Sequence, residues 1–180
     1  MGNPGERYAA TRHNLGFRVV DEVARRRGVR LDREECKAFV GASDDGGLRL
    51  AKPLTYMNRS GYSARCLVER HAFEPGDLLV VYDEVALPLG RLRLRPGGSP
   101  AGHRGLESVI GELRSAEVPR LRLGIAAEEM PEELIDYVLS PFGGDEEATV
   151  DDMVERAADA CEAWYEEGIE AAMNRFNAAP

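Results

Sequence analysis

The apolar stretch at residues 77–82 is the feature that most constrains the fold. It reads Asp-Leu-Leu-Val-Val-Tyr and ends on Asp83 and Glu84. A short strand that is apolar on both faces is typical of a parallel sheet covered by helices on both sides. In such α/β sheets, ligands bind at the carboxyl ends of the strands. We therefore predict a buried strand here, with a polar site where it ends.

The rest of the chain alternates between helical and strand patterns around this run. Apolar residues recur at helical spacing over residues 15–27, and the Arg-Leu-Arg-Leu-Arg pattern at 91–95 predicts a strand with one buried face and one basic face. Further strands are predicted over 37–43, 47–53 and 120–125, and helices are predicted to about residue 71, over 103–113, 131–139 and 145–167, and after residue 168. We therefore predict that residues 1–180 form one α/β domain, with a mixed, mostly parallel twisted sheet flanked by helices.

The first residues depart from this pattern. A sheet of this class normally opens with a buried strand, but only Met1 and Gly2 precede the Asn-Pro-Gly turn at residues 3–5. We therefore expect the first strand to be missing, either because it was lost by truncation or because the chain starts after it.

Composition argues against a membrane protein and against a disulfide framework. No apolar run approaches the roughly 20 residues that span a bilayer. No signal peptide precedes the first turn, so we expect a cytoplasmic protein without membrane contact. The three cysteines, Cys36, Cys66 and Cys161, are odd in number and widely spaced. This pattern favours buried free thiols in a reducing compartment.

The net charge of -9 is unevenly distributed. Residues 1–30 and residues 89–125 each hold seven Arg against three acidic residues, whereas residues 126–180 hold sixteen acidic residues against two Arg. If the two basic segments meet in space, they form an electropositive face for a phosphate ligand. Solvated arginines on a helix are the alternative for Arg25, Arg26 and Arg27, and the acidic tail is interpreted as a solvated helix face.

The polar residues around the predicted strand end suggest hydrolysis. His13 lies on a loop just before a helix and can accept a proton at neutral pH. Asp83 could orient this imidazole, and Asn58 could stabilise an oxyanion. A polar loop histidine without a role is the alternative for His13. No Gly-x-Ser-x-Gly motif and no Cys–His neighbours support covalent catalysis. Histidines occur in only three separate segments, which is a weak metal signal, so no metal site is predicted.

The glycine-rich loop at residues 97–102 has the Gly-x4-Gly spacing of a phosphate-binding loop. It continues with His103 and Arg104 instead of Lys-Ser/Thr, and it does not match the dinucleotide-binding pattern. Backbone N–H groups of such a loop, placed before a helix, can bind an anion. We predict one phosphate as its ligand, with a structural turn as the alternative.

Taken together, these segments resemble the bacterial-type peptidyl-tRNA hydrolase family over nearly the whole chain. The matching blocks are residues 3–5 with 8–14, 52–61, 83–84 with 87–90, 97–105 and 120–125. Each block alone is weak, but five ordered blocks at compatible spacing are specific.

The resemblance implies an enzyme that hydrolyses the ester between a peptide and the 3′-terminal ribose of tRNA, which rescues tRNA from stalled or dropped-off peptidyl-tRNA. It implies that His13 is the general base, that Asp83 is its partner, and that Asn3 lies beside the peptide. The substrate-binding positions that it implies are Tyr8, Tyr56, Met57, Asn58, Arg95, His103 and Arg104. It also implies a monomer that contacts the acceptor end of tRNA through phosphates and needs no metal or cofactor.

One position departs from the family pattern. Arg104 follows His103 where the family commonly has Asn, so it either adds a phosphate contact or weakens the substrate site. The alternative function is a non-catalytic RNA-binding relative of the same fold, like the chloroplast splicing factors of this family. A His–Asp pair favours the enzyme, because a binding module has no need of one. The third possibility is a small-molecule hydrolase, whose activity would be insensitive to salt.

Overall fold

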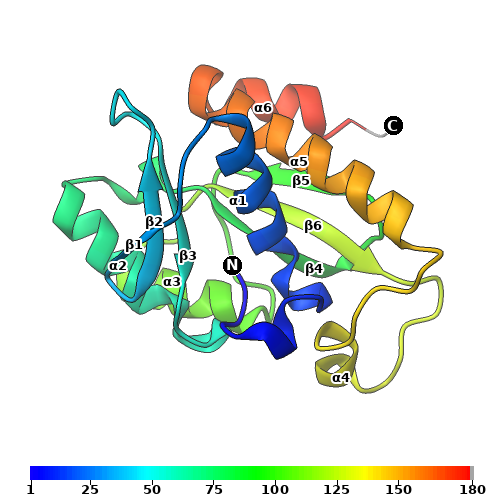
Figure 1. Ribbon diagram of the computed structural model, residues 1–180. Helices are drawn as coiled ribbons and strands as arrows, with labels where there is room; N and C mark the ends of the chain where they lie inside the picture. Colours follow the sequence, from blue (N-terminus) through cyan, green and yellow to red (C-terminus); the bar gives the residue numbers. More distant parts are fainter. Residues whose placement is uncertain (179–180) are drawn as a thin grey trace.

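The computed structural model describes residues 1–178, which form two three-stranded sheets and six α-helices (Figure 1). The strands are β1 (Arg33–Glu35), β2 (Ala38–Ala42), β3 (Arg49–Pro53), β4 (Val80–Pro88), β5 (Leu92–Arg95) and β6 (Arg120–Ala126). The α-helices are α1 (Leu15–Arg26), α2 (Ser60–His71), α3 (Arg104–Leu113), α4 (Leu134–Val138), α5 (Glu147–Glu167) and α6 (Ile169–Phe176). Short 3-10 helices are η1 (Glu6–Tyr8), η2 (Arg12–Asn14), η3 (Met57–Arg59) and η4 (Pro75–Asp77). Within this described part, no helix is long and apolar enough to span a bilayer.

The sheets confirm the α/β class but correct the predicted strand directions. One sheet has the order β4-β6-β5, in which β4 and β6 are parallel and β5 and β6 are antiparallel. The other has the order β1-β2-β3 and is antiparallel throughout. The expectation of a mostly parallel sheet was therefore wrong in detail. Strands joined by tight turns must run antiparallel, since a parallel pair needs a long crossover connection.

Most predicted elements are present, with shifted boundaries. The buried strand begins at Val80 instead of residue 77, because residues 75–77 form η4. The β1 strand was not predicted at all. Strand β5 has the predicted alternation, with Leu92 and Leu94 buried and Arg93 and Arg95 exposed.

The central strand β6 separates two hydrophobic cores. Leu121 and Leu123 of β6 pack with α1 and α5 in one core, which includes Leu15 and Met153. The second core joins Val80 and Tyr82 of β4 to Leu106 and Val109 of α3, together with Met57. Figure 1 shows α1 and α5 on one side of this sheet and α3 on the other. Strand β4 is thereby held between both cores, which fixes the position of Asp83 and Glu84. The prediction that the strand ends on these two residues was wrong, because β4 continues to Pro88.

Within residues 1–178, α1 is preceded by two short 3-10 helices, η1 and η2, and by no strand. Met1 is buried, and the N-terminus lies between β3 and β4 (Figure 1). Its amino group donates a hydrogen bond to the Val81 carbonyl. The beginning of the chain is therefore packed into the fold next to β4.

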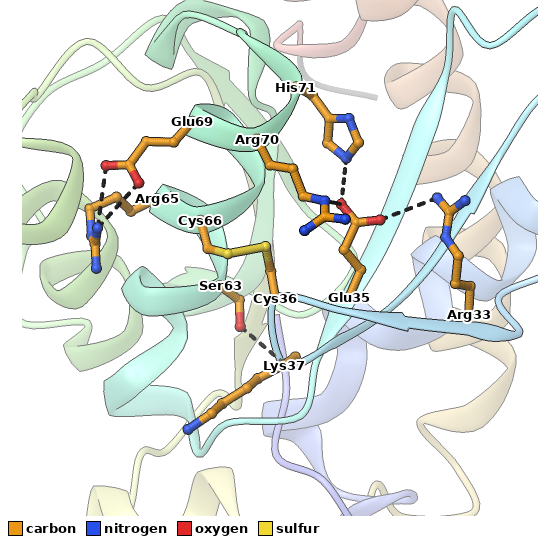
Figure 2. The surroundings of a disulfide bond; sticks show 10 residues. All are labelled: Arg33, Glu35, Cys36, Lys37, Ser63, Arg65, Cys66, Glu69, Arg70 and His71. Atoms are coloured by element: carbon orange, nitrogen blue, oxygen red, sulfur yellow. Dashed lines mark hydrogen bonds and ion pairs between the residues drawn. A yellow bond between two sulfur atoms is a disulfide. The ribbon is translucent and has the colours of Figure 1, made fainter.

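The prediction of three free thiols was wrong for two of them. Cys36 and Cys66 form a disulfide with a Cα–Cα distance of 5.6 Å, which ties the β1–β2 turn to α2 (Figure 2). Cys36 and Lys37 both have positive φ, as the two-residue turn of a hairpin requires. Sequence separation did not reveal this contact, because the turn and the helix meet only in the folded state. Cys161 is free, as predicted.

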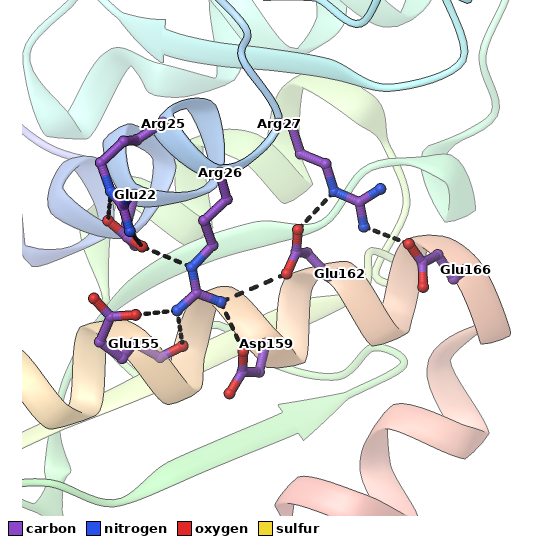
Figure 3. A network of polar contacts seen from close by, with 8 residues as sticks. All are labelled: Glu22, Arg25, Arg26, Arg27, Glu155, Asp159, Glu162 and Glu166. Atoms are coloured by element: carbon purple, nitrogen blue, oxygen red, sulfur yellow. Dashed lines mark hydrogen bonds and ion pairs between the residues drawn. The ribbon is translucent and has the colours of Figure 1, made fainter.

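The interpretation of the acidic tail as a solvated face was also wrong in part. Acidic side chains of α5 pair with the arginines of α1 (Figure 3). Arg26 lies 2.6 Å from Asp159, and Arg27 lies 2.6 Å from Glu162 and also pairs with Glu166. The first basic segment is therefore largely neutralised by the tail. The arginines of α1 are therefore not available to form one electropositive face with the second basic segment.

Candidate active site

The site is centred on a hydrogen bond between His13 and Asp83. His13 lies in η2, immediately before α1, and Asp83 lies in β4. The His13 Nδ1 atom is 2.8 Å from Asp83 Oδ2 and 3.0 Å from Asp83 Oδ1. The carboxylate is buried, with a side chain that is 2% exposed, whereas the imidazole is 16% exposed. Because Asp83 accepts a hydrogen bond from the Nδ1–H group, the Nε2 atom of His13 is left as the basic nitrogen.

A second imidazole, that of His103, faces the same carboxylate. His103 caps the start of α3, where its Nδ1 accepts a hydrogen bond of 3.1 Å from the Leu106 N–H. In the neutral ring the proton is then on Nε2, which lies 3.5 Å from Asp83 Oδ1. Sequence reasoning assigned His103 to substrate binding and gave no hint that it faces Asp83.

Asp83 is thereby held as an anion. Burial alone raises the pKa of its carboxyl, but His103 and His13 facing it lower the pKa well below its usual range. A charged carboxylate at this point can orient the His13 ring and stabilise the imidazolium that forms when Nε2 takes a proton.

The same three side chains form a possible metal-binding group. One ligand atom each from His13, Asp83 and His103 lie within 4.8 Å of one another. His13 and His103 thus come together in space although they lie in separate segments of the sequence. His13 Nδ1 and the carboxylate already contact each other at hydrogen-bond distance, so a metal would have to displace that bond.

Asn3 is fixed beside this pair by two sets of hydrogen bonds. Its Oδ1 accepts from the Met57 N–H at 2.8 Å. Its backbone N–H donates to Asn14 Oδ1 at 2.8 Å, and Asn14 Nδ2 donates to the Asn3 carbonyl at 2.9 Å. Because a backbone N–H can only donate, Oδ1 must face Met57, which leaves Nδ2 as a free donor within the described residues. Asn14 was missed as a positioning residue, and its only sequence signal was its place next to His13.

Met57 packs against the site from the side of the hydrophobic core. It is 4% exposed and belongs to the core beside Leu106. Its side chain passes so close to Gly105 that a Cβ there would lie 2.6 Å from Met57 Sδ and 3.0 Å from His103 Cε1. Glycine at position 105 therefore allows Met57 and His103 to pack together.

The remaining predicted substrate-binding residues lie at the surface. Asn58 and Arg104 are exposed and line one groove of about 1020 Å³ between α2 and α3. Tyr56 is 55% exposed, and the Tyr8 hydroxyl accepts a hydrogen bond from Arg7 at 2.6 Å. Arg95 is exposed at the end of β5. The structure thus brings together His13, Asp83, His103, Asn3 and Met57, and it brings Asn58 to Arg104. It gives no contact between Tyr8 or Arg95 and either group.

A buried arginine fixes the glycine-rich loop. Arg120 donates to the carbonyls of Gly98, Ser99, Ala116 and Val118 at 3.0–3.1 Å. Burial lowers the pKa of this guanidinium. Sequence reasoning placed Arg120 in a strand with no distinct role, because side-chain direction at a strand's first residue is not visible in the pattern. One of the amides at the start of α3, Leu106 N–H, is already taken by His103.

The second basic segment keeps much of its charge. Arg122 pairs with Glu84 at 2.8 Å. The other six arginines of this segment have no acidic partner within residues 1–178; besides the buried Arg120 they are Arg91, Arg93, Arg95, Arg104 and Arg114. Arg93 and Arg122 are register partners in the β5–β6 pair, and Arg95 is the partner of Arg120, so this face of the sheet is rich in arginine. This face and the start of α3 are the parts of the site that can attract phosphate groups.

Known proteins share both the sequence and the fold. The family model described as peptidyl-tRNA hydrolase matches residues 1–180. The peptidyl-tRNA hydrolase of Symbiobacterium thermophilum is 47% identical, over 98% of this chain and 96% of its own length. That of Chloroflexus aggregans is 44% identical, with the same coverage of both chains.

Solved structures agree with these sequence matches. The crystal structure of peptidyl-tRNA hydrolase from Acinetobacter baumannii superposes with a TM-score of 0.91, at 32% identity, over 98% of this chain and 91% of the other. With the match over residues 1–180 and relatives well above 40% identity, this chain belongs to the peptidyl-tRNA hydrolase family.

Proposed function

We propose that this chain hydrolyses the ester bond of peptidyl-tRNA with a water molecule activated by His13. The observation that carries the proposal is the 2.8 Å contact between His13 Nδ1 and the buried Asp83 carboxylate. It leaves Nε2 free to take a proton from water, which then attacks the ester carbonyl. The tRNA 3′-hydroxyl is the leaving group, so neither a covalent intermediate nor a cofactor is needed.

Asn3 is proposed to bind the peptide part of the substrate. Its Nδ2 donor can reach a peptide carbonyl, because the Met57 N–H holds Oδ1 on the other side. A preorganised donor of this kind orients the ester for attack and costs little reorganisation during the reaction. Asn58 is proposed to act near the scissile carbonyl from the adjacent η3 helix.

The tRNA part is proposed to bind through its phosphates. Arg95 and Arg104 are exposed and have no acidic partner within residues 1–178, so their charge is available to the acceptor end. Tyr8 and Tyr56 are proposed to contact the terminal nucleotides. Arg104 shares its groove with Asn58, which supports a phosphate contact close to the catalytic group.

The test is release of peptide from an N-acetylated aminoacyl-tRNA by the wild-type chain and by two variants. His13→Ala is expected to lower kcat at least about 100-fold, because the general base is lost. Asp83→Asn should lower kcat as well, because an amide cannot stabilise the imidazolium. His71→Ala is the matched control, since His71 lies 2.6 Å from Glu35 beside the β1–β2 turn and should leave kcat unchanged.

Two outcomes would contradict this proposal. Full turnover in His13→Ala would remove His13 from the reaction. Tight tRNA binding without turnover in the wild-type chain would instead favour the RNA-binding alternative, in which Arg104 serves binding alone.

We also propose that residues 1–180 act as a single domain and as a cytoplasmic monomer. All the groups named above come from one chain, so no second protein copy is needed to complete the site. Sedimentation equilibrium with and without tRNA tests the monomer, and cell fractionation tests the location.

A further inference from the structure

The disulfide between Cys36 and Cys66 lies where a small molecule can reach it. Cys36 begins the β1–β2 turn, and Cys66 lies in the middle of α2 (Figure 2). Neither cysteine belongs to the two hydrophobic cores within residues 1–178, and both residues are partly exposed. A reductant can therefore attack this bond without unfolding either core.

The turn has a backbone conformation that its two residues do not favour by themselves. Cys36 and Lys37 have φ values of 53° and 52°, in the left-handed region. Asn and Gly favour such two-residue turns, whereas residues with longer side chains adopt this region rarely. Besides the disulfide, Ser63 of α2 holds the turn, since its Oγ donates a hydrogen bond of 3.1 Å to the Lys37 carbonyl. The shape of the turn thus depends on its contacts with α2.

Ion pairs next to the disulfide also hold the turn on α2. The Glu35 side chain, which is 8% exposed, lies 2.6 Å from His71 Nε2 and 3.2 Å from Arg70 Nε (Figure 2). These contacts involve no sulfur atom, so they remain when the disulfide is open. The two thiols then stay near each other, and the disulfide can form again.

The beginning of α2 is connected to the proposed substrate site. The η3 helix, which carries Met57 and Asn58, leads directly into α2, and the Met57 N–H donates to Asn3 Oδ1. The α2 helix also packs on α3, so closely that a Cβ at Gly61 would collide with the Ser108 carbonyl. Both α3 and the β1–β2 turn therefore support α2, and a change in the turn alters one of these two supports.

We propose that Cys36 and Cys66 form a reversible thiol–disulfide site that tunes substrate binding through α2. A dithiol opens this site by exchange: the S–S bond breaks, each sulfur gains one electron and one proton, and the dithiol loses two of each and closes into its own disulfide. A small-molecule disulfide re-forms the bond and is itself reduced to two thiols.

Reversibility fits the location proposed above for this chain. Disulfides of cytosolic proteins, where they occur, are usually transient, catalytic or redox-sensing. Cys161 takes no part in the exchange, because burial raises the pKa of its thiol to about 12 and keeps it protonated. The effect on substrate binding rests on the proposed function, whereas the redox site itself does not.

The first experiment counts the thiols of the full chain. The folded chain is treated with oxidised glutathione or with dithiothreitol, freed of the reagent, and then unfolded in guanidinium with a thiol-reactive dye. One thiol per chain, that of Cys161, is expected after oxidation, and all three cysteines should react after reduction. Three reactive thiols after both treatments would overturn the proposal.

The second experiment compares the melting temperatures of the two forms. The oxidised chain should melt about 10 °C above the reduced chain, because the disulfide closes a long loop in the unfolded state. The matched control is Cys36→Ser/Cys66→Ser, which keeps Cys161 and should melt at the same temperature after both treatments. Equal melting temperatures of the two wild-type forms would overturn the proposal.

The third experiment measures the coupling to the substrate site with an N-acetylated aminoacyl-tRNA. Reduction should raise KM by about threefold and leave kcat within about twofold, because η2 and β4, not α2, carry His13 and Asp83. The amide NMR signals of residues 57–61 should shift on reduction, whereas those of β5 should not. The Cys36→Ser/Cys66→Ser variant should have the KM of the reduced form after both treatments.

The outcomes separate this proposal from the proposed function. Equal KM values in two wild-type forms that both hydrolyse the substrate would overturn the coupling through α2. Absence of hydrolysis in both forms would contradict the proposed function instead. The thiol count, the melting temperatures and the NMR signals would then still decide whether the redox site exists and whether it acts on α2.

Discussion

The arginines before residue 30 and those after residue 89 are equal in number but differ in what they contact. In the first region, the charges of α1 are matched by the acidic side chains of α5, and Arg12 is matched by Glu146 (Figure 3). In the second region, six of the seven arginines have no acidic partner within residues 1–178, and all of these except Arg120 are at least partly exposed. The first set therefore holds helices together, whereas the second set leaves positive charge at the surface.

This difference teaches that the count of charges in a segment does not determine its electrostatic field. Two segments with seven Arg and three acidic residues each would attract a tRNA phosphate equally if neither paired with charges elsewhere in the chain. Within residues 1–178, folding pairs seven of the sixteen acidic residues of the tail with arginines of the first segment, and none with arginines of the second. A negative net charge is thus compatible with a phosphate-binding face, because much of the acid is used internally.

Among the variants that test this comparison, Arg12→Ala is expected to have the largest effect, which is on the free energy of unfolding. Arg12 is 7% exposed, makes two hydrogen bonds of 2.9 and 2.7 Å to Glu146, and lies over the rings of Tyr137 and Phe142. Its removal leaves a partly buried carboxylate without a charged partner, with only the Gly143 N–H still bound to it, which should lower the free energy of unfolding by about 3 kcal/mol. Urea unfolding at pH 7 measures this change.

Two further variants control this prediction. Arg7→Ala should change stability little, since Arg7 is exposed and bonds only to Tyr8. Arg12→Lys keeps the charge but loses the two-pronged contact. Its free energy of unfolding should therefore lie between those of wild type and Arg12→Ala. A loss below about 1 kcal/mol in Arg12→Ala would mean that this pair contributes no more than an ordinary surface salt bridge.

A smaller effect, on tRNA affinity alone, is expected in the second region. The double variant Arg95→Gln/Arg104→Gln should weaken binding to tRNA by about tenfold at low salt, which is about 1.4 kcal/mol, and should lower the salt dependence by about two phosphate contacts. The melting temperature should not change, because both side chains are exposed. Filter binding at several salt concentrations measures the slope.

The matched control for the second region is Arg25→Gln/Arg27→Gln, which removes the same charge from α1. If this control weakens tRNA binding as much as the first pair does, the comparison between the two regions is wrong. Binding would then respond to net charge alone.

The sequence predicted the elements of this fold better than their contacts. Local periodicity located the core-facing side of α1 and the alternation of β5, since both depend only on neighbours along the chain. The disulfide between Cys36 and Cys66 and the pairing of α1 with α5 were missed. These contacts join segments that are far apart in the chain, and no local pattern encodes which turn meets which helix.

In the candidate site, too, the residues were predicted better than their contacts. His13, Asp83 and Asn3 were predicted from residue type and from the family resemblance, and the structure places them together. The contact of His103 with Asp83 and the anchoring of the glycine-rich loop by Arg120 were not predicted. Each depends on where a side chain points after packing, which one sequence does not specify.

The smallest effect is expected from Arg26→Ala on the pH dependence of stability. Hydrogen bonds from Arg25 and Arg26 lower the pKa of Glu22 from 4.5 to about 2. A carboxyl group with a lowered pKa in the folded state stabilises the fold above its usual pKa, and this contribution is lost as the pH falls towards the lowered value. At pH 6, Arg26→Ala should therefore cost about 1 kcal/mol, as expected for a surface network.

Between pH 4.5 and pH 3, the difference between wild type and Arg26→Ala should shrink, because the pKa of Glu22 is lowered less in the variant, where the carboxyl takes up a proton first. Urea unfolding at pH 6, 4.5 and 3 measures this trend. Arg30→Ala is the control, since the Arg30 side chain is 88% exposed and lies 3.6 Å from Asp32. A difference that stays constant from pH 6 to pH 3 would show that Arg26 stabilises α1 by packing on α5, not by its charge, and the contrast between the two arginine-rich regions would lose its electrostatic basis.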